Sequence, residues 1–172
     1  MISDLIRNIF RFFFLCLAQV LIFQDLELGR FINLFPYVLF ILLLPFITPS
    51  WLVLLLSFFT GLVIDFYYNT GGIQASACVL MAFVRTGFLK LFSQREGFEP
   101  GMEPTRQFLG TSGFFSYAGV LIFIHHFVAF YLEAFRLSEL FITFLRVVLS
   151  SAGTLLVVVL IQFLFYKKKQ RT

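Results

Sequence analysis

The chain has few charged residues and few of the residues that interrupt helices. Only 13% of its 172 residues are charged, and it contains two cysteines, five prolines and one tryptophan. An average globular domain has about 25% charged residues, so this composition excludes a water-soluble fold. Both cysteines, Cys16 and Cys78, lie in apolar runs. We therefore expect them to pack as small apolar residues rather than to form a disulfide or a metal site.

Catalytic motifs are also missing. The chain has no H-E-x-x-H, no G-x-S-x-G, no phosphate-binding G-x-x-x-x-G-K-[ST] and no G-x-G-x-x-G. Asp65 is the only aspartate inside an apolar run, whereas an intramembrane protease or a metal-dependent lipid transferase needs a dyad or a cluster of carboxylates. We expect no enzymatic activity, no cofactor, no metal and no nucleic-acid partner.

The chain is instead rich in apolar residues, which make up 60% of it and include 27 phenylalanines. A hydrocarbon core about 30 Å thick requires about 20 apolar residues per helix. The sequence therefore predicts an all-α integral membrane protein, a bundle of six transmembrane helices in a single domain of residues 1–172. The predicted spans are residues 9–24, 34–48, 51–68, 73–92, 113–133 and 141–166.

The second span is the least regular of the six. Pro36 and Pro45 interrupt it, and Pro49 forms a turn signal with its neighbours Thr48 and Ser50. A tilted, broken or re-entrant segment is therefore an open alternative. If this segment does not cross the bilayer, the number of spans falls to five.

Positive charges predict the orientation, because they concentrate on the cytoplasmic side of a membrane protein. Six spans place most of the lysines and arginines on the side of the two termini. The opposite loops then hold only Arg30 and Arg136. We expect a membrane protein with both termini and the 93–112 loop in the cytoplasm. The basic residues on that side are Arg7, Arg11, Lys90, Arg95, Arg106, Lys167, Lys168, Lys169 and Arg171.

Ionisable residues inside the spans are candidates for structure or function, because each is costly in hydrocarbon. Asp65, Glu133 and Arg146 share the outer half, so Arg146 can pair with one of the two carboxylates. Arg85 lies in the inner half, and we expect it to extend toward the cytoplasmic headgroups rather than to hold a dedicated partner.

His126 and Glu133 are seven residues apart and fall on one helix face, while His125 points elsewhere. A proton relay along this face is one interpretation. Hydrogen bonds to neighbouring helices are the interpretation that we favour.

The segment GLVIDFYYNTGGIQASACVLMAF has a glycine four residues before an aspartate, an aromatic pair, an Asn-Thr-Gly-Gly turn and a helix that begins with small residues. This pattern resembles the core signature of the MreD family of rod shape-determining proteins. The segment NLFPYVLFILLLPFITPSW, the loop REGFEPG and the helix with IHHF resemble the branch of that family in Bacteroidetes-type bacteria. Gly61, Asp65, Gly71 and Gly72 are the family-like positions.

The resemblance implies a non-catalytic inner-membrane scaffold of the peptidoglycan synthesis machinery for cell elongation. Such a protein is expected to bind the bitopic partner MreC, and through it MreB, RodA, its transpeptidase and RodZ. Its fold is expected to resemble the substrate-binding subunits of energy-coupling-factor transporters. Small residues such as Gly61 and Ala77 would allow close contact with a partner's transmembrane helix.

A small-molecule-binding subunit of such a transporter is the alternative. Its substrate pocket would lie in the outer half, lined by Asp65, Asn69, Glu133 and Arg146. The sequence of the first helix argues against this alternative. FFFLCLAQVLIF lacks the Ala-x-x-x-Ala motif with which those subunits dock onto the transporter's energising module.

Overall fold

The computed structural model describes residues 2–23, 32–93, 101–134 and 140–165, and all of their regular structure is helical. The basic tail after Tyr166, the loop residues Arg95 to Pro100, and Arg30 and Arg136 lie outside this described part. Five helices are long and apolar enough to span a membrane. The chain is thus an all-α protein of the multi-pass membrane type.

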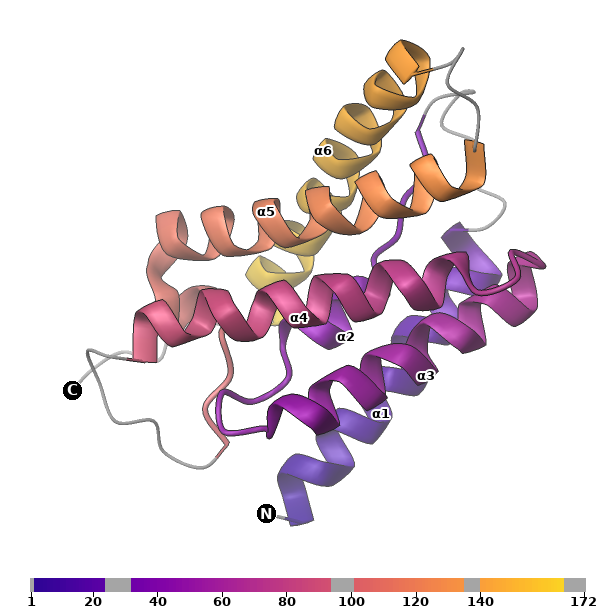
Figure 1. The fold of residues 1–172 in the computed structure, drawn as a ribbon. Helices are drawn as coiled ribbons and strands as arrows, with labels where there is room; N and C mark the ends of the chain where they lie inside the picture. Colours follow the sequence, from indigo (N-terminus) through magenta and orange to yellow (C-terminus); the bar gives the residue numbers. More distant parts are fainter. Residues whose placement is uncertain (1, 24–31, 94–100, 135–139, 166–172) are drawn as a thin grey trace.

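Helix α1 (Ile2–Ala18) continues as the π-helix η1 (Gln19–Phe23). Helices α3 (Ser50–Tyr68) and α4 (Ile73–Ser93) form a tight hairpin. Helices α5 (Arg106–Ala134) and α6 (Leu140–Phe165) form a second pair. In Figure 1, α3, α4 and α5 lie side by side in a front layer, and α1 and α6 lie behind its two edges.

Four of the predicted spans coincide with long helices, and the first coincides with α1 and η1 together. Helix α5 begins earlier than predicted, and Gly110 (φ 74°, ψ 167°) breaks it after its first turn. The main body of α5 thus begins close to the predicted residue 113.

The second predicted span is not a continuous helix. Only Val38–Leu42 is helical there (α2), and the backbone on either side is extended or turned. This broken segment, residues 32–49, runs behind α4 through the middle of the bundle (Figure 1). Residues 34 to 44 are all nearly inaccessible to solvent. Irregular backbone is tolerated at membrane depth only where protein buries it, which explains this central position.

The broken segment nevertheless connects the two ends of the bundle. Its first part bonds to Gln19 at the end of α1 and to the middle of α6. Its last part bonds to Arg11 of α1 and to Met102 just before α5. The broken segment can thus serve as a sixth membrane crossing beside the five long helices, which gives the even number of crossings that the charge distribution predicts. Six membrane crossings remain a prediction.

The two ends of the bundle differ in charge. We call one the basic end, because it carries Arg7, Arg11, Arg85, Lys90 and Arg106. At this end the start of α5 meets the end of α6 through a hydrogen bond from Arg106 N–H to Gln162. At the opposite end, the end of α5 meets the start of α6 through Glu133 and Arg146.

The outer surface is apolar and the polar side chains lie inside. Phe66, Phe141 and Leu164 are more than two-thirds exposed, while Gln19, Ser57, Thr60, His125 and Ser150 are fully buried. This distribution is the reverse of that in a water-soluble helical protein.

Candidate functional site

The turn between α3 and α4 is built around the side chain of Asp65. Its carboxylate accepts hydrogen bonds from the backbone N–H groups of Gln74 (2.9 Å) and Ala75 (2.8 Å), and also from the hydroxyl of Thr70. These N–H groups belong to the first turn of α4, where helix geometry leaves them without partners. Asp65 therefore caps the start of α4 from the end of α3, and its negative charge favours the helix N-terminus.

The family-like glycines serve the same turn. Asn69, Gly71 and Gly72 have positive φ (54°, 60° and 96°), so the chain reverses direction in four residues. Gly61 lies where α3 touches α4: a Cβ there would be 2.4 Å from the Cα of Ala75. Ala77 is fully buried within the chain. Gly61 and Ala77 thus support contacts inside this protein, whereas the sequence analysis had assigned them to contact with a partner.

Arg85 does not extend to the surface, contrary to expectation. Its side chain is only 2% exposed, and its Nε donates to the Tyr117 hydroxyl (3.0 Å). Its Nη2 donates to the Leu44 carbonyl. The broken segment explains this inward position, because the carbonyls that end α2 need donors inside the protein. Tyr117 and Arg11 serve two more of them, at Leu42 (2.7 Å) and Leu43 (3.2 Å).

The two histidines hold the first part of the broken segment. His126 Nδ1 bonds to the Ile122 carbonyl (2.9 Å), so this nitrogen carries the proton, and Nε2 accepts from the Thr154 hydroxyl (3.2 Å). The same hydroxyl accepts from Phe35 N–H (3.1 Å), and the Phe35 ring stacks on His126. This arrangement is the interhelical hydrogen bonding that we favoured over a proton relay.

His125 is buried as well, and its ring contacts both Phe35 and His126. Its Nε2 lies 2.8 Å from the Tyr37 hydroxyl, which donates to Gln74 (3.0 Å). With the proton on Nε2, this nitrogen donates to Tyr37, and the unbonded Nδ1 is only an acceptor without a donor. With the proton on Nδ1, a buried N–H donor would have no acceptor, which costs more free energy. We therefore assign the Nε2–H tautomer. Tyr37 and Gln74 could not be recognised as bonding partners from sequence, because neither residue carries a charge.

Arg146 pairs with Glu133 (3.3 Å) and not with Asp65. The Glu133 side chain is 46% exposed and Arg146 lies over the Phe130 ring. The Asp65 carboxylate is occupied by α4, so of the two candidate partners of Arg146 only Glu133 pairs with it. Among the residues of the transporter alternative, Asp65 and Asn69 line a groove between α3 and α4, while Glu133 and Arg146 lie at α5–α6.

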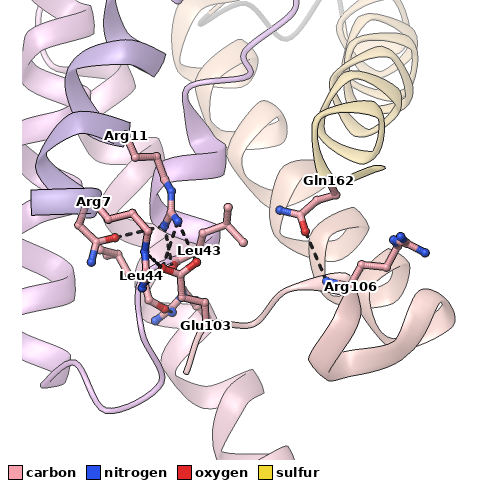
Figure 2. Close-up of polar contacts among 9 residues, drawn as sticks. Arg7, Arg11, Leu43, Leu44, Glu103, Arg106 and Gln162 are labelled. Carbon is pink, nitrogen blue, oxygen red and sulfur yellow. Dashed lines mark hydrogen bonds and ion pairs between the residues drawn. The ribbon is translucent and has the colours of Figure 1, made fainter. Parts of the chain in front are cut away.

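A charge cluster that the sequence analysis missed lies at the basic end. Glu103 is 8% exposed and binds Arg11 through both carboxylate oxygens (2.8 and 3.0 Å). Arg7 binds the same carboxylate at 3.0 Å (Figure 2). The cluster fixes the residues before α5 to the start of α1. Loop glutamates usually face water, so the spacing of 92 residues between Glu103 and Arg11 carried no usable signal.

A groove of about 1430 Å³ lies between α3 and α4. Apolar side chains form its walls, and small residues form its floor near the turn. The lining includes Leu54, Phe58, Leu62, Phe66, Gly72, Ala75, Ser76, Leu80 and Phe83. We call it the α3–α4 groove. Ser76 is exposed in it, and its hydroxyl bonds back to the Gly72 carbonyl (2.8 Å).

The described residues contain no group of three or more His, Cys, Asp or Glu side chains that could hold a metal ion. Cys16 and Cys78 are both free and buried. Comparisons with family models, with curated proteins and with solved structures found no significant match to the chain.

Proposed function

We propose that this protein is a non-catalytic, MreD-like scaffold of the cytoplasmic membrane that binds an MreC-like bitopic partner. Through that partner it links to MreB, RodA, its transpeptidase and RodZ in the synthesis of side-wall peptidoglycan. The proposed topology has six crossings with both termini in the cytoplasm, and the proposed fold is similar to that of energy-coupling-factor substrate-binding subunits.

One observation carries the proposal: the interior carboxylates and His126 take their partners from the chain itself. Asp65 caps α4, Glu103 binds two arginines and His126 binds Thr154. Buried ionisable groups in an enzyme or a carrier are held for a substrate. Here they stabilise the bundle, which leaves the outer surface for interaction.

The α3–α4 groove is the surface that we assign to the partner's transmembrane helix. Helix contacts in a bilayer depend on close packing over small residues, and Gly72, Ala75 and Ser76 provide such a floor. A helix about 10 Å wide and about 18 Å long, roughly three turns, has about the volume of the groove.

Co-purification in mild detergent tests the proposal. An MreC-like protein should accompany the wild-type bait, whereas an ATPase pair in its place would favour the transporter alternative. Ser76→Leu should reduce the captured partner at least tenfold, because the new side chain fills the groove without entering the core. Ser116→Leu, at an exposed serine of α5, is the matched control and should retain the partner.

Two outcomes contradict the proposal. Full capture by Ser76→Leu would mean that the groove is not the docking surface. A His126→Ala protein that is abundant and fully partnered but does not support rod shape would point to proton-coupled or substrate-binding work instead of scaffolding.

A further inference from the structure

A small polar cavity opens at the basic end, between the start of α3 and the last turns of α4. Its volume is about 140 Å³, and Thr48, Ser50, Arg85, Thr86 and Lys90 contribute polar groups to its lining. A single water molecule needs only about 10–15 Å³ of such space. The cavity therefore has room for a polar group of several atoms.

Arg85 gives this cavity a buried positive charge. Its two hydrogen bonds use Nε and Nη2, with a hydroxyl and a carbonyl as acceptors. Among the side chains that the structure describes, no carboxylate pairs with Arg85 and no acceptor binds Nη1. Glu103, the described carboxylate of this end, is held by Arg7 and Arg11. A buried charge without a counter-ion is costly, so an anion in the cavity would relieve that cost.

The surroundings of Arg85 favour an anion as well. Lys90, one to two turns further along α4, is exposed at the cavity mouth. Helix α3 begins at Ser50 with Pro49 as its N-cap, and no side chain caps its first N–H groups. Such a helix start attracts anions, phosphate in particular. The hydroxyls of Thr48 and Ser50 add donors that a phosphate oxygen can use.

An apolar groove of about 620 Å³ adjoins the cavity. It runs between α1 and α3, with Ile9, Phe13, Leu52, Leu56 and Phe59 among its walls. Thr48 lines both the groove and the cavity. A site with a cationic pocket at one end and an apolar groove beside it matches an amphiphile that has an anionic head and a hydrocarbon chain.

We propose that the basic end holds one phosphate-bearing lipid, with its phosphate between Arg85 and Lys90 and an acyl chain in the α1–α3 groove. Charge complementarity selects the headgroup, and the adjoining groove selects a lipid over free phosphate. This lipid site is independent of the α3–α4 groove and of the partner proposed above.

Native mass spectrometry of the purified full-length protein in neutral detergent tests this site. The probe is dioleoyl phosphatidic acid; dioleoylglycerol has the same chains without phosphate, and glycerol phosphate has the phosphate without chains. We expect one saturable phosphatidic acid adduct, no retained dioleoylglycerol, and binding of glycerol phosphate at least a hundredfold weaker. Lys90→Gln should weaken the adduct about fivefold, from the loss of one headgroup cation.

The control is Arg146→Gln, which removes one positive charge at the opposite end and should leave the adduct unchanged. Arg85→Gln should weaken phosphatidic acid binding more than Lys90→Gln does. If the Arg85→Gln protein does not fold, the Lys90→Gln variant still tests the site, because Lys90 is exposed. Equal binding by wild type and Lys90→Gln overturns the phosphate assignment. Equal binding of glycerol phosphate and phosphatidic acid overturns the lipid assignment.

Discussion

The carboxylate of Asp65 joins two helices with three hydrogen bonds and no cation. Two of its donors are backbone N–H groups at the start of α4, and the site is 5% exposed. Hydrogen bonds to a charged group contribute about 1.5–3 kcal/mol each where water is excluded. Asp65 is therefore a structural residue of the hairpin, although an aspartate inside an apolar run first suggests chemistry.

Asp65→Asn should destabilise the protein by about 1–3 kcal/mol. The amide oxygen can still accept from one N–H of α4, but the amide nitrogen then faces the other N–H without an acceptor. Thermal unfolding in detergent measures the loss as a lower Tm. Glu133→Gln serves as the control, because that half-exposed pair is worth only about 0–1 kcal/mol. Equal Tm changes for the two variants would rule out the capping function.

Several single residues could be interpreted from sequence and others could not. Asp65 and His126 were recognisable because an ionisable group in an apolar run stands out, and the interhelical bonding of His126 followed from its depth. The inward position of Arg85 was not predictable, since its acceptor at Leu44 exists only because α2 ends there. Arginines that extend to headgroups and arginines that turn inward have the same local sequence.

At the scale of elements, the α3–α4 hairpin is the tightest unit of the fold. Gly61 allows the α3 backbone to touch α4 at Ala75, and the positive φ values of Gly71 and Gly72 allow the short turn. Close backbone contact of this kind is how helices associate in lipid, where burial from water supplies no driving force.

Gly61→Ala and Gly87→Ala should have opposite effects on stability. A Cβ at Gly61 meets backbone atoms at 2.4 Å and forces the helices apart, at a cost of about 1–3 kcal/mol. A Cβ at Gly87 meets nothing within 4 Å, so the better helix propensity of alanine should add up to about 1 kcal/mol. Thermal unfolding of both variants tests this pair. A Gly61→Ala protein as stable as wild type would contradict the contact.

The long helices were predictable because apolar runs of about 20 residues have few alternatives. The segment 34–48 was expected to be a span, with a broken segment as the open alternative, and only Val38–Leu42 is helical. Pro36 and Pro45 indicated the interruption, but hydropathy measures side chains and not backbone pairing. Ser150 and Thr154 of α6 accept from Asn33 and Phe35, and the local sequence could not show these partners.

At the scale of the whole molecule, the charges are arranged along the bundle axis. Five basic residues with described side chains lie at one end, and Arg146 lies at the other in an ion pair. Helix α1 and the residues just before α5 meet at the basic end, where Arg7 and Arg11 bind Glu103 (Figure 2). The Gln162 bond brings the last turns of α6 there too.

This arrangement leads to a topology prediction. A reporter fused after Thr172, or inserted near Gly101, should be active only as a cytoplasmic reporter, because positive charges stay on the cytoplasmic side. A reporter inserted within residues 135–139 is the matched control and should be periplasmic. Periplasmic activity at Thr172 would contradict the proposed topology.

The broken segment also has a consequence for the order of assembly. A helix that pairs its own backbone can enter the bilayer as soon as it is synthesised, but residues 32–49 take partners from α4, α5 and α6. Those helices are translated later, and exposing the unpaired segment to hydrocarbon before then would be prohibitively costly. Residues 32–49 must therefore settle into the interior after the C-terminal helices have been inserted. A segment near the N-terminus is thus the last part of this protein to reach its final position.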